Sequence, residues 1–496
     1  MKNTTTLLFL FLSFSTIKAQ QISDALQYSQ DDITGNARYR AMGGAFGALG
    51  GNLSALNVNP AGSAIFTSNF SSVTLSSYNQ QNESNYFGTK SKEDNASLDM
   101  NQLGMVWVFD NYYLDSKWSK FSIAMNYDQT NNFNNSMYAR GYNPTNSVAN
   151  YYLSYANGIP ENILSSIPYT DLSYNEQQAY LGYNGYFINP TTGNQYTSAV
   201  NPNGNYFQEN NVESRGYNGK ITFNIGAEYD KRFYFGMNLN AHFSNFETTS
   251  SFYEDTFDSP GNNTATGVQA SRFTNQLYTY GSGFSFQLGA IAKVTNDFRV
   301  GISYESPTWY NLNDELKQTL SVNCPDCIPN TTSFIVSPNT VLIYPTYQLK
   351  TTARYTGSLS YIFGSKGLIS FDYSLRDYSN LKFQPSSEFF SANDAISNAL
   401  SISNEVRIGG EYRIKRWSVR GGFRYEESPY KNKNTVGNLN SYSTGFGYDF
   451  GDFKIDMAYI YAKRTNNTAF FAQGLTDTAN VKAIQNNVVV TVGFQM

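Results

Sequence analysis

Apolar and polar side chains alternate one by one along several stretches of the chain, most clearly between Tyr217 and Tyr229. One face reads Tyr217, Ile221, Phe223, Ile225, Ala227 and Tyr229, and the other reads Asn218, Lys220, Thr222, Asn224, Gly226 and Glu228. After the turn at residues 230–232, the alternation resumes and continues to Ser244. A period of two is that of a β-strand. The two stretches therefore predict an antiparallel strand pair with one apolar and one polar face.

Similar segments recur along most of the chain and number about fourteen, an even number as in bacterial outer-membrane barrels. They lie near residues 70–78, 100–110, 119–129, 216–229, 232–246, 279–294, 297–306, 347–363, 367–378, 404–414, 417–427, 441–450, 453–464 and 487–494. In such barrels, lipid-facing apolar residues alternate with polar residues that face the lumen. We therefore predict an all-β fold, a membrane-spanning antiparallel β-barrel of about 14 strands.

The connections between these segments alternate in length. Short turns occupy residues 230–232, 295–297, 364–366, 415–416 and 451–452, and long connections rich in Asn, Ser and Tyr occupy 130–215, 247–278, 307–346, 379–403 and 465–486. Outer-membrane barrels have short periplasmic turns and long extracellular loops. We expect the short turns and both termini on the periplasmic side of a bacterial outer membrane.

Composition agrees with a barrel and excludes other classes. Aromatic residues make up 16% of the chain, with 40 Tyr and 36 Phe, whereas hydrophobic residues in total reach only 40%. After the N-terminal segment, no apolar run approaches the roughly 20 residues of a transmembrane helix, which excludes a helical membrane protein. The net charge of -4 offers no basic block for phosphates, so we expect no nucleic-acid partner.

The first 66 residues differ from the strand array. Lys2, an apolar stretch over residues 7–14 and Ala19 follow the order of a signal peptide, with cleavage expected after Ala19. The next stretch is Gly-rich and mostly uncharged. We therefore expect a signal peptide at 1–19, a plug or hatch at 20–66 and the barrel with its loops at 67–496.

The hatch segment carries the most specific motifs of the chain. They are Arg40-Ala41-Met42-Gly43-Gly44-Ala45-Phe46, then Ser54-Ala55-Leu56 and Asn59-Pro60-Ala61-Gly62. They resemble the N-terminal signature of the FadL/TodX family of outer-membrane long-chain fatty-acid and hydrocarbon transporters. Stretches at 357–373 and 406–423 also resemble this family, so the resemblance spans nearly the whole mature chain.

The resemblance implies a fourteen-stranded barrel closed by an N-terminal hatch, with a hydrophobic ligand that enters a pocket and leaves sideways through the wall. Hatch and gating roles would fall to Gly43, Gly44, Asn59, Pro60 and Ala61. The alternative is a purely structural role, in which these residues form a tight turn that packs the plug. The first long connection could form either a landing patch for a lipid tail or part of the membrane rim, through Tyr151, Tyr152, Tyr155, Tyr180, Tyr183, Tyr186 and Phe187.

A fatty-acid carboxylate would favour an arginine inside the lumen, because the guanidinium group binds carboxylates through two parallel hydrogen bonds. We single out Arg354 and Arg376 as ligand-binding candidates, since they have fewer acidic neighbours in the sequence than the other inward-facing basic residues, Asp372 apart. The alternative is an ion-pair network, because Glu228, Glu305, Asp372, Glu405, Glu411 and Glu426 share the inner face.

Cys324 and Cys327 are the two cysteines of the chain. Their spacing fits a redox motif, half of a zinc site or a small disulfide that staples one loop. No second Cys or His cluster completes a metal site, and an exported chain favours the disulfide. We expect no metal and no cofactor.

An enzymatic function is not expected. The single histidine, His242, stands two positions from Ser244 on one strand, and side chains at this spacing lie about 7 Å apart, too far for a nucleophile and its base. The preferred function is passive, ligand-gated passage of hydrophobic small molecules, most specifically long-chain fatty acids, by a monomer in outer-membrane lipid. The alternatives are a receptor for another apolar ligand such as haem, and a general porin, which the hatch opposes.

Overall fold

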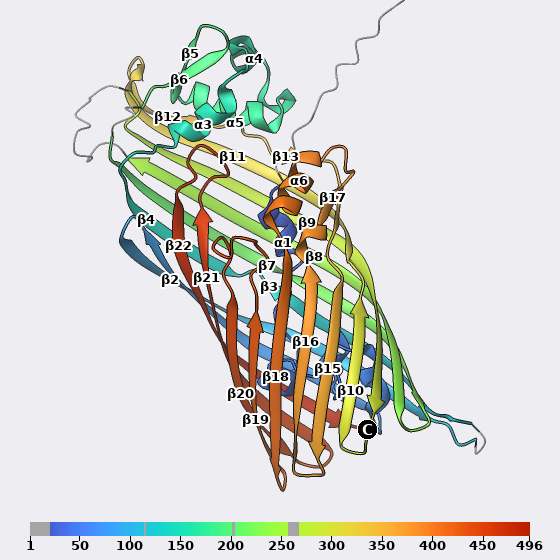
Figure 1. Cartoon of the computed structure of the whole chain (residues 1–496). Coiled ribbons are helices and arrows are strands. Elements are labelled where there is room, and N and C mark those ends of the chain that lie inside the picture. Colours follow the sequence, from blue (N-terminus) through green and yellow to red (C-terminus); the bar gives the residue numbers. More distant parts are fainter. Residues whose placement is uncertain (1–19, 114–115, 201–203, 256–266) are drawn as a thin grey trace, which may run out of the picture.

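The computed structural model describes residues 20–113, 116–200, 204–255 and 267–496. The expected signal peptide at 1–19 therefore lies outside the described residues. Within them, fourteen strand positions form a closed antiparallel wall, because the last strand pairs with the first (Figure 1). The prediction of a 14-stranded all-β barrel is confirmed. Among the helices described, none is long and apolar enough to cross a bilayer.

Twelve wall positions are single strands and two are broken. The single strands are β1 (Phe70–Tyr86), β2 (Thr89–Asp110), β3 (Trp118–Asn132), β7 (Tyr206–Tyr229), β8 (Phe233–Asp255), β9 (Ala270–Lys293), β16 (Gly367–Asp377), β18 (Ile402–Ile414), β19 (Trp417–Glu426), β20 (Leu439–Asp449), β21 (Phe453–Ala469) and β22 (Thr478–Gln495). The broken positions are β10 (Phe298–Glu305) with β11 (Trp309–Ile328), and β14 (Tyr347–Lys350) with β15 (Arg354–Phe363).

The alternation of side chains is turned inside out relative to a water-soluble protein. On β7, Phe223 and Ile225 are 55% and 57% exposed on the outer surface. Their neighbours Thr222 and Asn224 are buried toward the lumen. An exposed apolar face and a polar interior are favourable only when the outer surface is covered by lipid.

Aromatic side chains gather where strands meet the short turns. The Trp118 ring lies 5.0 Å from the Tyr229 ring and 6.2 Å from the Phe121 ring, centroid to centroid. These residues stand at the ends of β3 and β7 next to the turn at 230–232. Their position corresponds to one of the aromatic girdles that border the apolar band of such barrels.

The opposite end, here called the long-loop end, rises well beyond a membrane. β7, β8 and β9 contain 24, 23 and 24 residues, whereas about 9–11 residues cross the apolar core. β4 (Asn135–Asn143) pairs with β7 beyond the end of β3 and extends the wall. A cap covers this end (Figure 1) and consists of α3 (Ala149–Ala156), α4 (Glu161–Ser166), a 3-10 turn (Tyr169–Asp171), α5 (Tyr174–Asn184), β5 (Ile188–Thr191) and β6 (Gln195–Ser198). Smaller elements add to it, namely β12 (Thr331–Val336), β13 (Leu342–Ile343), a 3-10 turn (Tyr378–Asn380), β17 (Lys382–Gln384) and α6 (Phe390–Ala399).

The hatch lies inside the barrel. It contains α1 (Ile22–Gln27), α2 (Ala37–Ala41) and two 3-10 turns, Leu53–Asn57 and Pro60–Ile65. Asparagine side chains cap three of these short elements: Asn36, Asn52 and Asn59 accept hydrogen bonds from the backbone N–H groups of Tyr39, Ser54 and Ala61. Such caps satisfy donors that a helix start leaves unpaired, which holds a segment of little regular structure in one conformation.

Two expectations differ from the structure at the long-loop end. The connection 307–346 contains β11, which continues the wall. Its apolar side chains, such as Leu312, Leu316 and Leu320, face inward, which is the reverse of the pattern expected for a lipid-facing strand. The described N-terminus also lies elsewhere than expected. Met496 stands at the short-turn end, bonded to the carbonyl of Asn69, whereas Gln20 is buried in the half of the lumen nearer the long loops and donates to Asp314 of β11. The hatch runs along the lumen, so its two ends lie at different levels.

Candidate functional site

Glycines in the wall let the hatch backbone touch the barrel backbone. At Gly289 of β9, an added Cβ would lie 2.0 Å from Oδ1 of Asn59, and at Gly236 of β8 it would lie 2.3 Å from the carbonyl carbon of Pro60. Gly301 and Gly422 meet other parts of the hatch in the same way. Sequence reasoning missed these residues, because an inward-facing glycine indicates a close backbone approach but does not show which glycine meets the hatch.

Asn59 ties the hatch to two strands of the wall. Its side-chain nitrogen donates to the carbonyls of Gly47 at 2.7 Å, Ala290 at 3.1 Å and Ile302 at 3.3 Å. Its oxygen accepts from the N–H of Ala61 at 3.1 Å. The Asn-Pro-Ala turn is thus the point at which the hatch, β9 and β10 meet.

Gly43 and Gly44 form a second contact of this kind. Both have positive φ, +60° and +74°, a conformation that favours glycine. A Cβ on Gly43 would lie 2.9 Å from the carbonyl oxygen of Phe423 in β19, and its N–H donates to Ser443 at 3.1 Å. The five predicted hatch residues therefore lie at the hatch–wall interface or within the turns beside it, and a gating role for them stays a prediction.

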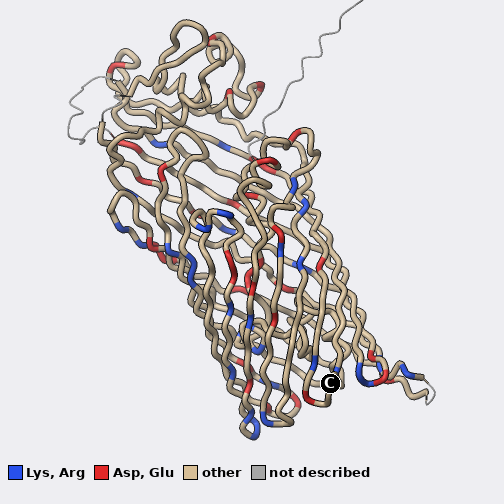
Figure 2. Tube along the Cα trace, in the orientation of Figure 1, with Lys and Arg blue, Asp and Glu red and all other residues tan. Residues whose placement is uncertain are grey.

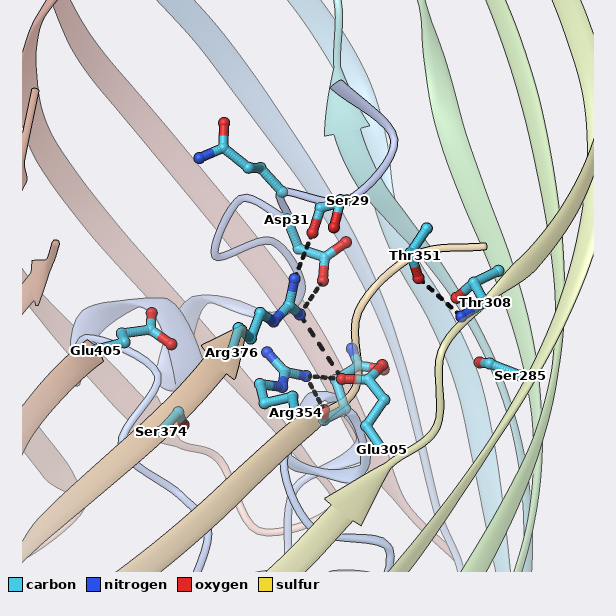
Figure 3. A network of polar contacts seen from close by, with 12 residues as sticks. Ser29, Asp31, Ser285, Glu305, Thr308, Thr351, Arg354, Ser374, Arg376 and Glu405 are labelled. Carbon is cyan, nitrogen blue, oxygen red and sulfur yellow. Dashed lines mark hydrogen bonds and ion pairs between the residues drawn. The ribbon is translucent and has the colours of Figure 1, made fainter. Parts of the chain in front are cut away.

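Arg354 and Arg376 point into the lumen and face each other across one acidic group (Figure 3). Nη2 of Arg354 lies 2.6 Å from Oε2 of Glu305, and it also donates to the carbonyl of Asn57 at 3.0 Å. Nη2 of Arg376 lies 2.7 Å from Oδ2 of Asp31 and 3.7 Å from Oε2 of Glu305. Both arginines are thus engaged by carboxylates.

The hatch itself provides one of these carboxylates. The sequence suggested few acidic neighbours for Arg354 and Arg376, but Asp31 comes from a segment more than 300 positions away, and Glu305 comes from β10. Burial acts to raise the pKa of Asp31, yet the cations of Arg376, Arg354 and Lys220 outweigh it and lower the pKa to about 2. Asp31 is therefore ionised at neutral pH and bound as an internal anion.

Several other inward-facing charges form ion-pair groups, whereas Asp372 accepts from the backbone N–H groups of Phe46 and Gly47 in the hatch. Glu405 receives Arg407 at 2.6 Å as well as Arg424, and Glu411 receives Arg420 at 2.7 Å together with two further arginines. In Figure 2, basic and acidic positions lie side by side along these strands. They neutralise one another inside the wall.

A cavity of about 1230 Å³ lies above the hatch, between α1 and the cap. We call it the outer cavity. Its floor includes Leu26, Gln27 and Gln30 of the hatch, and its walls include ten aromatic side chains: Tyr151, Tyr155, Tyr174, Phe252, Phe273, Phe389, Phe390, Tyr430, Phe470 and Phe471. Burial raises the pKa of Tyr174 to about 12, so that this hydroxyl is neutral at physiological pH.

The predicted landing patch is only partly at this cavity. Tyr151 and Tyr155 line it, whereas Tyr152 and Phe187 are buried in the core of the cap. The adjacent pairs Phe389-Phe390 and Phe470-Phe471 were missed. Paired aromatics within polar connections were the signal that would have found them.

A family model described as outer membrane protein transport protein (OMPP1/FadL/TodX) matches residues 167–496. The chain belongs to this family. A FadL homologue from Pseudomonas aeruginosa is similar in structure, with a TM-score of 0.55 at 12% identity over 94% of this chain and 99% of that one. The toluene transporter TodX from Pseudomonas putida gives a TM-score of 0.50 at 16% identity, over 94% and 99% of the two chains. These likenesses show the fold, and no curated protein sequence matches.

Membership makes the chain an outer-membrane β-barrel of a family that transports hydrophobic small molecules through the channel. Its wall has two irregular places. The first lies between β2 and β3, whose ladder stops at the pair Gln102 and Asp128. Beyond it, β2 continues on the β1 ladder and β3 on the β7 ladder, and both ladders shift register near this level.

The second irregular place lies beside Arg354 and Arg376. Residues 306–308 separate β10 from β11, and residues 351–353 separate β14 from β15. The N–H of Thr308 donates to Oγ1 of Thr351 at 2.8 Å, which links the two breaks (Figure 3). Pro307 has no N–H to donate, which explains why the strand is interrupted here.

The cysteine pair and the histidine of this FadL/TodX-family barrel make contacts that stabilise the fold. Cys324 and Cys327 are joined by a disulfide in β11. His242 contacts Ser285 of β9, not Ser244, with Nε2 2.8 Å from the hydroxyl oxygen. Ser285 is completely buried, so this contact braces neighbouring strands.

Proposed function

We propose that the protein mediates passive, ligand-gated passage of hydrophobic small molecules across the outer membrane. The observation that carries the proposal is the arrangement of the lumen, in which an aromatic cavity of about 1230 Å³ has the hatch itself as its floor. A ligand in this cavity touches α1 directly. A ligand that contacts a displaced hatch more favourably than the seated one can therefore shift the hatch toward the displaced position.

The long-loop end faces the outside in this proposal, and the short turns and Met496 face the periplasm, since long loops of such barrels are extracellular. A hydrophobic molecule enters at the outer cavity, and the monomer is sufficient for passage. The β2–β3 ladder end is the proposed exit to lipid, because backbone pairing across the wall stops there. A general porin needs an open lumen, which the seated hatch opposes.

Long-chain fatty acids stay the specific ligands predicted from the sequence. Their carboxylate needs a cation or must bind protonated, because burial of an unpaired charge is strongly unfavourable. Arg354 and Arg376 are the proposed partners, but a ligand would have to displace Asp31 from Arg376 or compete with Glu305. Gly43, Gly44, Asn59, Pro60 and Ala61 would hold the closed state of the hatch.

Uptake in intact cells tests the proposal, because the outer membrane is a barrier to hydrophobic molecules as well as to sugars. Cells would express the full chain or a chain that keeps residues 1–19 and lacks 20–60. We expect the full chain to admit a labelled hydrophobic probe and to exclude a labelled sugar of similar mass. The truncated chain should admit the sugar as well.

Two outcomes would contradict the proposal. Sugar entry through the intact chain would indicate a porin, and exclusion of every hydrophobic probe by a correctly inserted barrel would indicate a receptor. Heat-modifiable migration of each variant on gels serves as the control for barrel assembly, so that a leak or its absence is assigned to a folded protein.

A further inference from the structure

The outer cavity has almost no charge on its walls. Among the described residues that line it, Glu388 is the one charged side chain, and no Lys, Arg or His is present. Asp314 lies behind this lining and adds no cation: it accepts from Gln20 and from the hydroxyls of Thr279 and Tyr347. An anion would therefore meet no counter-charge in this cavity.

Several amide groups of the lining are left without partners. The side-chain nitrogens of Gln27 and Gln30 are buried and have no hydrogen-bond partner within the described part of the chain. The side-chain oxygens of Gln20 and Asn466 are in the same situation. Buried polar groups are rarely left unpaired in proteins. These four atoms are enclosed by protein, but they belong to residues that line the cavity. Rotation of these side chains would offer a ligand two donors and two acceptors, all of them uncharged.

The aromatic side chains supply the rest of the surface. The Phe471 ring lies 4.5 Å from the Tyr151 ring and 4.9 Å from the Phe252 ring, centroid to centroid, and it stacks on Phe273 at 6.3 Å. Flat apolar walls of this kind suit a ring system or an alkyl chain. The volume exceeds the usual range of roughly 300–1,000 Å³ for small-molecule pockets, so a single aromatic ring would leave most of it unfilled.

We infer that the outer cavity binds large, uncharged hydrophobic molecules that carry hydroxyl or carbonyl oxygens, in preference to fatty-acid anions. The inference rests on the proposed function and names the class of ligand that the outer cavity, the entry site of the transporter, binds. A hydroxyl group is both donor and acceptor, so it can pair with the amides of Gln27 and Asn466 when these side chains turn toward the ligand. A carboxylate loses its hydration on entry and gains no cation, so it enters only in its protonated form.

Three fluorescent probes with one common chain would test this inference: a pyrene-labelled dodecanol, the corresponding dodecanoic acid and the corresponding alkane. Binding to the purified full chain in detergent would be measured at neutral pH. We expect the alcohol to bind at least about tenfold more tightly than the acid, because the buried carboxylate is unpaired. The alkane should lie between them, since it lacks the hydrogen bonds of the alcohol.

The pH dependence separates this explanation from steric exclusion. As the pH falls from about 7.5 to about 5, toward the ordinary carboxyl pKa, the affinity of the acid should rise while that of the alcohol stays constant. An acid that binds as tightly as the alcohol at neutral pH, or whose affinity is independent of pH, would overturn the inference.

A charge introduced at Glu388 provides the matched variant. Glu388→Arg should raise the affinity for the acid by about tenfold or more and leave that for the alcohol little changed. Glu213→Arg is the control, since Glu213 is exposed on β7 and does not line the cavity. No gain with Glu388→Arg would overturn the claim that the missing cation excludes the acid.

Cell uptake keeps this inference distinct from the proposed function. If the acid enters cells faster than the alcohol, the inference fails and the transporter stands. If neither probe enters although both bind the purified chain, the proposed function fails. The preference of the cavity is then still decided by the binding measurements.

Discussion

The two halves of the lumen have opposite chemistry. Next to the hatch, inward-facing arginines are held by acids, as in the pair of Arg376 and Asp31 at 2.7 Å. Above the hatch, the outer cavity is aromatic, and its described lining contains no cation. One half is filled and neutralised from within, whereas the other is open and uncharged.

This difference separates closure of the channel from selection of the ligand. Ion pairs and backbone contacts at glycines hold the hatch against the wall, which suits a seal that must exclude water and ions. Aromatic walls suit capture of an apolar molecule. The short segment from α1 to Asp31 belongs to both halves, because it forms the cavity floor and ends in the ion pair. Occupancy of the cavity can therefore reach the seal over a few residues.

The largest expected effect is loss of the seal. Gly289→Ala places a Cβ 2.0 Å from Oδ1 of Asn59, and overpacking of this kind costs about 1–3 kcal/mol. We expect a displaced Asn-Pro-Ala turn and a clear rise in the entry of a hydrophilic antibiotic into cells. Gly357→Ala is the matched control, since nothing lies within 4 Å of its added Cβ. Equal entry through both variants would show that contact at Gly289 does not maintain the seal.

A smaller effect is expected from the ion pair. Arg376→Met leaves Asp31 without its main partner, and because the Asp31 side chain is 37% exposed, we expect a cost of only about 1–2 kcal/mol for hatch docking. Hydrogen exchange of the hatch amides would measure it. Adding Asp31→Asn should recover part of the loss, whereas additive effects of the two substitutions would mean that the residues do not interact.

The pH dependence of docking sharpens the same comparison. The pKa of Asp31 is lowered from 3.8 to about 2. A carboxylate with a depressed pKa in the docked state contributes stability above its ordinary pKa, and this contribution is lost as the pH falls through the lowered value. Hydrogen exchange of the hatch amides should therefore indicate an intact pair of Asp31 and Arg376 down to about pH 4. Protection of these amides should decrease only below that pH. A transition between pH 5 and 7 in wild-type protein that is absent from Asp31→Asn would contradict this assignment.

The smallest effect is expected from the disulfide, which lies near the end of β11 against the cap and lines neither the outer cavity nor the hatch. Cys324 and Cys327 are separated by three positions, and so short a loop contributes at most about 2 kcal/mol by restricting the unfolded chain. The double substitution to serine should lower the thermal stability of the cap slightly and leave uptake and sealing unchanged. A leak in this variant would place the disulfide in the closure of the channel.

Much of the wall could be predicted because lipid imposes a local rule on the sequence. Each strand must expose apolar side chains on one face, so Phe223 and Ile225 alternate with polar neighbours whatever the rest of the chain does. The turn at 230–232 and the other four short turns were found for the same reason. Where strands rise into water, as in β11, that rule no longer applies and the prediction failed.

The site could be predicted only in part. Asn59 and Gly43 were found because their motifs are contiguous in one short segment. The partners of those motifs, such as Gly289, looked like ordinary inward-facing glycines, because nothing local marks which one meets the hatch.

The sequence by itself determined the barrel, its strand number and the identity of the hatch, since these depend on periodicity and on contiguous motifs. Only the tertiary structure decided that Asp31 binds Arg376, that Gln20 lies near the long loops, and that aromatics from four separate connections enclose one cavity without a cation. The physical reason is distance along the chain. Charge pairing and cavity shape depend on side chains that are brought together by closure of the barrel, and no local pattern records which of them will meet.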